Sequence, residues 1–145
     1  MADRVSASIE IGGALPARLV PELLSAAQAD GGCIEWDTPL DENSIIPGET
    51  LEVCAHELPW GRFEHLEQFC MDQGLAYRKR AASCGGSFGA EREIYHGQGE
   101  TVSYEESEAG YVVIGLDAIR ALGSLDKIEH WFEAAEAPVP PLILA

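Results

Sequence analysis

Basic residues are scarce in this chain: Lys and Arg total 9 against 25 Asp and Glu, which gives a formal net charge of −16. No Lys or Arg occurs between Arg18 and Arg62, and none occurs between Arg92 and Arg120. Because phosphate binding needs clustered cations, this shortage argues against direct binding of nucleic acid or of an anionic membrane surface. It favours a very soluble chain that associates with basic partners.

Long apolar runs are also absent. No run reaches the roughly 18 residues that a membrane-spanning helix requires, and residues 1–10 lack the basic and apolar regions of a signal peptide. We therefore expect a cytoplasmic location with the cysteines as thiols. Cys33, Cys54 and Cys70 have apolar neighbours, as small core residues do, whereas Cys84 precedes two glycines and is expected to be exposed.

Complete cofactor and metal motifs are missing. The glycine-rich segment 85–89 has no following Lys-Ser/Thr pair, and the glycines at 97 and 99 do not continue into a dinucleotide-binding pattern. Cys54 and His56 form one close pair of potential zinc ligands, but zinc sites need a second pair. The acid clusters do not have EF-hand spacing. The sequence therefore predicts no cofactor and no metal.

The first 82 residues predict two strand–helix–strand units. Apolar residues alternate over residues 5–11, and helical spacing follows from Leu15 to Ala27, with Gly12-Gly13 expected to end the strand. Pro21 requires that this helix either kink or begin near Val20.

A similar unit follows 43 residues later, where Leu58-Pro59 is expected to open a second helix. At this offset Leu23 corresponds to Leu66, Ala27 to Cys70 and Gly31 to Gly74. The resulting βαβ–βαβ order resembles the ferredoxin-like fold, which implies two helices covering one face of a shared sheet.

The remainder predicts three short strands at 91–95, 101–105 and 111–114, followed by a short helix and an amphipathic terminal helix. We therefore expect an α+β fold: a single domain over 1–136, with a ferredoxin-like duplicated βαβ core at 1–82 and a C-terminal β-meander plus helix at 90–136. Residues 137–145 contain three prolines and are expected to form a non-helical apolar tail that docks on the body or on a partner.

The excess of carboxylates leads to the main functional hypothesis, a non-catalytic protein–protein interaction module that binds a basic site on a partner. In its narrower form that site normally binds nucleic acid, and the protein acts as a mimic, such as an inhibitor of a bacterial defence complex. The expected contact residues are the clustered acids Asp37, Asp41, Glu42, Glu100, Glu105, Glu106 and Glu108.

Two alternatives stay open. The chain could be a small enzyme or ligand-binding domain in which Cys84 acts as nucleophile with His56 or His96 as base. It could also be a structural homo-oligomer, such as a homodimer, joined through strand edges or through the apolar tail.

Overall fold

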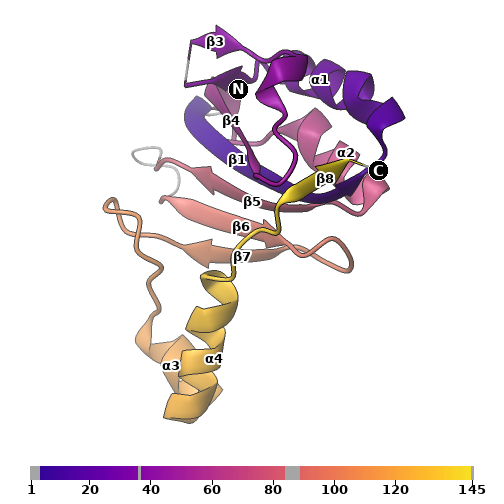
Figure 1. Cartoon of the computed structure of the whole chain (residues 1–145). Helices are drawn as coiled ribbons and strands as arrows, with labels where there is room; N and C mark the ends of the chain where they lie inside the picture. Colours follow the sequence, from indigo (N-terminus) through magenta and orange to yellow (C-terminus); the bar gives the residue numbers. More distant parts are fainter. Residues whose placement is uncertain (1–3, 36, 84–88, 145) are drawn as a thin grey trace.

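The computed structural model describes residues 4–35, 37–83 and 89–144. Within them, eight strands form a sheet in the order β3-β2-β4-β1-β5-β6-β7, and β8 pairs with β1 off this path (Figure 1). All pairings are antiparallel except the parallel pairing of β8 with β1. The strands are β1 (Arg4–Leu15), β2 (Cys33–Ile34), β3 (Thr38–Pro39), β4 (Leu51–Pro59), β5 (Ala76–Ala81), β6 (Glu91–Tyr95), β7 (Val102–Glu105) and β8 (Leu142–Leu144).

The helices occupy two separate places. Helices α1 (Val20–Ala29) and α2 (Glu64–Gln73) cover one face of the sheet, whereas α3 (Leu116–Leu122) and α4 (Leu125–Ala135) form an arm that extends from the β7 side (Figure 1). Two 3₁₀ turns, η1 (Ala17–Leu19) and η2 (Glu42–Ser44), complete the described elements. The chain is thus a mixed α+β protein, as the sequence predicts at this level.

The main core lies between the sheet and the two covering helices. Every second residue of β1 from Val5 to Ile11 is buried, which is the alternation that the sequence predicts. Helix α1 contributes Leu23 and Ala27 to this core, and α2 contributes Leu66 and Cys70. The other side of the sheet, called here the open face, carries Glu10, Arg78 and Arg80 among other polar residues.

Both helices begin later than the start of their apolar patterns. Helix α1 begins at Val20 after the 3₁₀ turn, so Pro21 sits in its first turn, where the missing N–H is harmless. The prediction that Leu58-Pro59 opens α2 is wrong. Leu58 is paired with Val5 in the sheet, Pro59 is the last residue of β4, and α2 begins at Glu64.

Gly12-Gly13 does not end the first strand, which continues to Leu15. The reason is β8, which runs parallel to residues 13–15 and closes over Gly12. A Cβ at Gly12 would overlap the carbonyl oxygen of Pro140, so glycine is needed here for close backbone approach rather than for a turn. The tail is therefore part of the sheet, with Leu142 fully buried.

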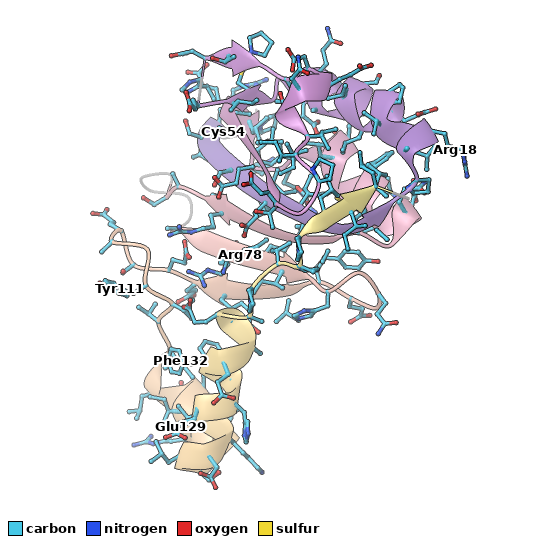
Figure 2. The ribbon with its side chains drawn as sticks, in the orientation of Figure 1. Arg18, Cys54, Arg78, Tyr111, Glu129 and Phe132 are labelled. Atoms are coloured by element: carbon cyan, nitrogen blue, oxygen red, sulfur yellow. The ribbon has the colours of Figure 1, made fainter. Side chains whose placement is uncertain are left out.

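The predicted three-stranded meander is only partly formed. Strands β6 and β7 pair along four residues, but residues 111–114 contribute one isolated bridge, between Glu106 and Val112. The turn at 107–111 brings the chain back beside β7 for one bridge, and the chain then leaves to form the arm. Tyr111 lies at this exit and Phe132 lies on α4 (Figure 2).

Candidate functional site

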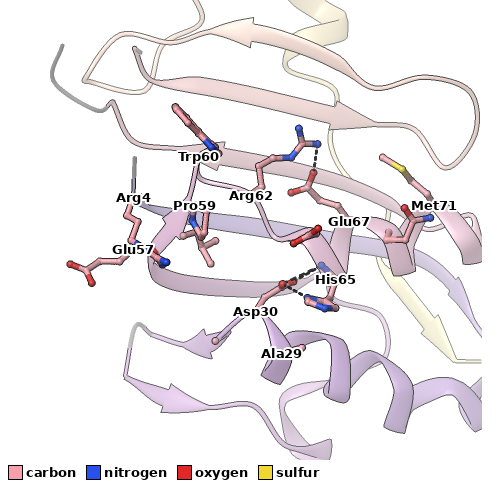
Figure 3. Close-up of a pocket in the computed structure, with 14 residues that line it drawn as sticks. Arg4, Ala29, Asp30, Glu57, Pro59, Trp60, Arg62, His65, Glu67 and Met71 are labelled. Carbon is pink, nitrogen blue, oxygen red and sulfur yellow. Dashed lines mark hydrogen bonds and ion pairs between the residues drawn. The ribbon is translucent and has the colours of Figure 1, made fainter. Parts of the chain in front are cut away.

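A cavity of about 740 Å³, called here the α2 cavity, lies where the end of β4 meets the start of α2 (Figure 3). That volume is within the range of typical small-ligand sites. It is lined by Arg4, Ala29, Asp30, Gly31, Glu57, Leu58, Pro59, Trp60, Arg62, Glu64, His65, Glu67, Gln68 and Met71. Trp60 stands at its edge with half of its surface exposed.

The backbone leading into this cavity is strained at two positions. Glu57 (φ 52°) lies at a bulge in β4, where two residues oppose one residue of β1. Trp60 (φ 56°) follows Pro59 in a turn closed by the Gly61 N–H donating to the Leu58 carbonyl, at a position that favours glycine. Left-handed backbone at non-glycine residues costs about 1–3 kcal/mol each and is concentrated at functional sites.

A buried ionic cluster consists of Glu67, which lines the α2 cavity, together with Lys79, Glu93 and Tyr77 behind it. The Lys79 ammonium lies 3.4 Å from Glu67 and 3.2 Å from Glu93, and the Tyr77 hydroxyl donates to Glu93 at 2.6 Å. Glu67 also accepts the Phe63 backbone N–H at 2.7 Å, which helps to begin α2. Arg62 reaches Glu67 from the cavity side at 3.4 Å.

The two carboxylates of this cluster have pKa values shifted in opposite directions. Burial raises the pKa of Glu67 despite the nearby Lys79. Burial alone would also raise the pKa of Glu93, but the hydrogen bonds and charge from Tyr77 and Lys79 outweigh it and lower that pKa. The same burial raises the pKa of the Cys70 thiol to about 12, so Cys70 is an inert core residue.

Asp30 connects the two helices beside the cavity. It follows the last residue of α1, and its carboxylate accepts the backbone N–H groups of His65 and Leu66, in the first turn of α2, at 2.8–3.1 Å. The His65 ring lies 2.8 Å from the same carboxylate (Figure 3). The hydrogen bond to Asp30 and its charge raise the pKa of His65. Asp30 is therefore an N-terminal cap supplied from a distant helix.

The helix side has two further hollows next to the α2 cavity. A groove of about 570 Å³ between α1 and α2, called here the interhelical groove, shares Ala29, Glu64, His65 and Gln68 with the α2 cavity. A pocket of about 540 Å³ lies between α1 and β3 and includes Glu42. The acids Glu22, Glu64 and Asp72 line the groove beside Ala26 and Phe69.

The structure does not bring the expected contact acids together. Asp37, Asp41 and Glu42 lie around β3, at one edge of the sheet, whereas Glu100, Glu105 and Glu108 lie around β7, at the opposite edge. Six strand steps of about 4.8 Å place the two groups roughly 29 Å apart along the sheet. Asp41 also accepts from the Asn43 N–H as the cap of η2. A single negative face made of these residues does not form.

Glu106 was expected at the surface as a partner contact, but the structure places it inside the protein. It is buried, and its carboxylate lies 2.7 Å from Arg92 and 3.1 Å from Arg80 on the open face. Arg92 also donates to the Ala135 carbonyl at 2.8 Å, so the three charges fasten the arm to the sheet. The isolated bridge to Val112 turns Glu106 inward, and the sequence alone gives no sign of that bridge.

The residues of the enzyme hypothesis are not gathered either. His56 lies on β4 and His96 follows β6, three strand steps or roughly 14 Å away across the sheet. They also lie near opposite ends of the strands, since His56 is next to the Ala7 pairing and Tyr95 pairs with Tyr77 opposite Ile11. Cys84 lies outside the described residues.

The basic residues are largely committed to internal ion pairs. Five of the nine, Arg62, Arg78, Lys79, Arg80 and Arg92, pair with five glutamates. Arg78 and Arg80 point to the open face and Lys79 to the core, which is the alternation expected of three successive cations on one strand. Among the described residues the other acids greatly outnumber the four remaining cations, the exposed Arg4, Arg18, Arg120 and Lys127.

Across the residues that the structure describes, no group of three or more His, Cys, Asp and Glu side chains could hold a metal ion. No helix in the same residues is long and apolar enough to cross a bilayer. No family model, curated protein or solved structure matches the chain.

Proposed function

We propose that this protein is a non-catalytic acidic interaction module that binds a basic segment of a partner protein along the interhelical groove. The observation that carries the proposal is the separation of charge: four of the nine cations lie in β5 and β6 and pair with glutamates, whereas the covering helices place the carboxylates of Glu22, Glu64 and Asp72 along the groove. The proposal keeps the cytoplasmic location expected from the sequence.

The composition of the groove supports a peptide-like occupant. Glu22, Glu64 and Asp72 stand beside the apolar surface of Phe69 and Ala26. An amphipathic basic segment would bury its apolar side against that surface and place Lys or Arg beside the carboxylates. In the narrower form of the proposal the segment belongs to a site that normally binds nucleic acid, for which the carboxylates substitute as phosphate mimics.

Matched charge reversals test this proposal. The groove variant carries Glu22→Lys and Asp72→Lys, and the control carries Glu129→Lys and Glu133→Lys on α4, with the same change in net charge. Wild type and both variants are used for affinity capture from source-cell lysate at low and high salt, and each retained protein is purified and titrated against salt. We expect the groove variant to bind more weakly with a shallower salt dependence and the control to bind like wild type.

An equal loss in the control variant would mean that net charge, and not the groove, governs binding. Binding that is independent of salt in every variant would contradict the proposal outright. Circular dichroism of each variant confirms that the helices persist.

We also infer that residues 4–81 form a ferredoxin-like duplicated unit. The strand order β2-β4-β1-β5, with α1 and α2 on one face, supports this assignment. The 43-residue offset supports it too, because Leu23 and Leu66 are both fully buried and Gly31 and Gly74 both have φ near 70°.

A second candidate is small-ligand binding in the α2 cavity, favoured by the strained, half-exposed Trp60 beside a buried ionic cluster. Screening a metabolite library by Trp60 fluorescence, in a Trp36→Phe/Trp131→Phe background, tests it. A ligand that quenches this emission and raises the melting temperature would support the candidate, and loss of its binding in Arg62→Ala would locate it. A screen without such a ligand would count against it.

A further inference from the structure

Two cysteines face each other across neighbouring strands. Cys33 in β2 is the register partner of Cys54 in β4, and the two strands run antiparallel. Residues directly opposite in such a pair point to the same face with Cβ atoms about 4.5–5.5 Å apart. Antiparallel register partners have Cα atoms about 4.5–5.5 Å apart, which lies within the roughly 4.4–6.8 Å that disulfides span.

The orientation of this pair is fixed by its neighbours. A Cβ at Gly32 would lie against Val53 and Ala27 in the core, so the next residue, Cys33, points to the open face. Cys54 lies between the buried residues Val53 and Ala55, and so points to the same face. Both cysteines are half-buried; Cys54 lines an open-face pocket of about 450 Å³, and Cys33 lines the pocket of about 540 Å³ between α1 and β3. A small reagent can therefore reach Cys54 from the open-face pocket, and Cys33 is its register partner on the neighbouring strand.

We propose that Cys33 and Cys54 form a dithiol modification site that closes to a disulfide by exchange with a low-molecular-weight disulfide. One thiolate attacks a sulfur of the small disulfide and releases its first half as a thiol, leaving a mixed disulfide on the protein. The second cysteine, as thiolate, then attacks the protein-bound sulfur and releases the other half. The two cysteines lose two electrons and two protons, and the reagent gains them.

The bond would link the short strand β2 covalently to β4. Strand β2 has two residues and one register partner in β4, and it carries β3 at the edge of the sheet. The closed loop would contain about 20 residues, a length for which a disulfide usually stabilises a fold measurably. The expected result is a melting temperature higher by roughly 5–15 °C, which dithiothreitol should reverse.

The experiment uses the full chain with Cys84→Ser, treated with oxidised glutathione and mapped by mass spectrometry without reduction. Because no Lys or Arg lies between Arg18 and Arg62, trypsin leaves both cysteines in one peptide. Cleavage after glutamate separates them, since Glu35, Glu42, Glu49 and Glu52 lie between. We expect a linked Cys33–Cys54 peptide pair and no comparable link to Cys70.

Phenylarsine oxide, which needs two adjacent thiols, provides a second measurement on the reduced protein. It should bind with one equivalent to the Cys84→Ser chain and should lose stable binding in Cys33→Ser and in Cys54→Ser alike. Cys70→Ser, which removes a buried thiol, should leave arsenical binding unchanged. The proposal is overturned if glutathione only caps single cysteines, or if the arsenical binds equally well without Cys33.

Discussion

The helices that cover the sheet, α1 and α2, and the helices of the arm, α3 and α4, have similar apolar content but bury different amounts of it. Helices α1 and α2 bury Leu23, Leu66 and Cys70 completely, whereas the described arm helices bury only Ala135. Leu125 on α4 is 69% exposed and Leu116 on α3 is 59% exposed. An amphipathic pattern predicts that a helix has an apolar face, but it does not predict how much surface will cover that face.

Breaking the buried charge cluster should give the largest difference between the two regions. Lys79→Met leaves Glu67 and Glu93 buried without their shared cation, so we expect the free energy of unfolding to fall by about 3–5 kcal/mol. Lys127→Met, on the exposed side of α4, should change it by less than about 0.5 kcal/mol. Urea unfolding followed by circular dichroism measures both.

A triple variant distinguishes the cost of buried, unpaired charge from the cost of lost packing at Lys79. Adding Glu67→Gln and Glu93→Gln to Lys79→Met removes the uncompensated charges and should recover most of the lost stability. If the triple variant is no more stable than the single one, lost packing rather than buried charge explains the effect.

Truncating one leucine in each region should give the second-largest difference in the free energy of unfolding. Leu66→Ala in α2 empties a fully buried site and should cost about 2–5 kcal/mol, depending on how far the core collapses. Leu125→Ala in α4 removes a side chain that is already 69% exposed and should cost less than about 0.5 kcal/mol. Similar losses by urea unfolding at both positions would show that the arm is as well covered as the body.

Substituting one glycine in each region compares how tightly the backbone of the sheet body and of the arm is packed. Gly12 lies in β1, and Gly115 lies just before α3. Gly12→Ala would force the Pro140 carbonyl away from β1 and should cost about 1–3 kcal/mol while releasing Leu142. Gly115→Ala, at the N-cap of α3, has open space around its Cβ position and should cost less, at most about 1 kcal/mol, without moving the tail. Urea unfolding gives the energies, and carboxypeptidase digestion reports the tail. A tail equally protected in both variants would contradict the proposed docking.

The sequence predicted the parts of the fold that depend on local periodicity. Alternation in β1 and helical spacing in α1 and α2 follow from short-range patterns, and each is present. It could not predict that Gly12 lies under β8, or that Glu106 turns inward to Arg92, because both depend on contacts with distant segments. The same limit applies to Asp37 and Glu105, whose placement at opposite edges follows only from the strand order.

The smallest expected effect concerns His65 at the junction of the two helices. The hydrogen bond and charge of Asp30 raise its pKa above the ordinary value of 6.5. Since the folded-state pKa is the higher one, this pair stabilises the fold fully below about pH 6.5, and the contribution disappears as pH rises through the folded-state pKa. Urea midpoints measured from about pH 5.5 to about pH 8.5 should therefore fall more steeply in wild type than in His65→Gln.

The His65 ring is exposed and its charge is screened by solvent, so the difference should be small. Asp30→Asn should flatten the same part of the pH profile. An unchanged slope in both variants would show that Asp30 acts only as the cap of α2 and gains nothing from the imidazolium.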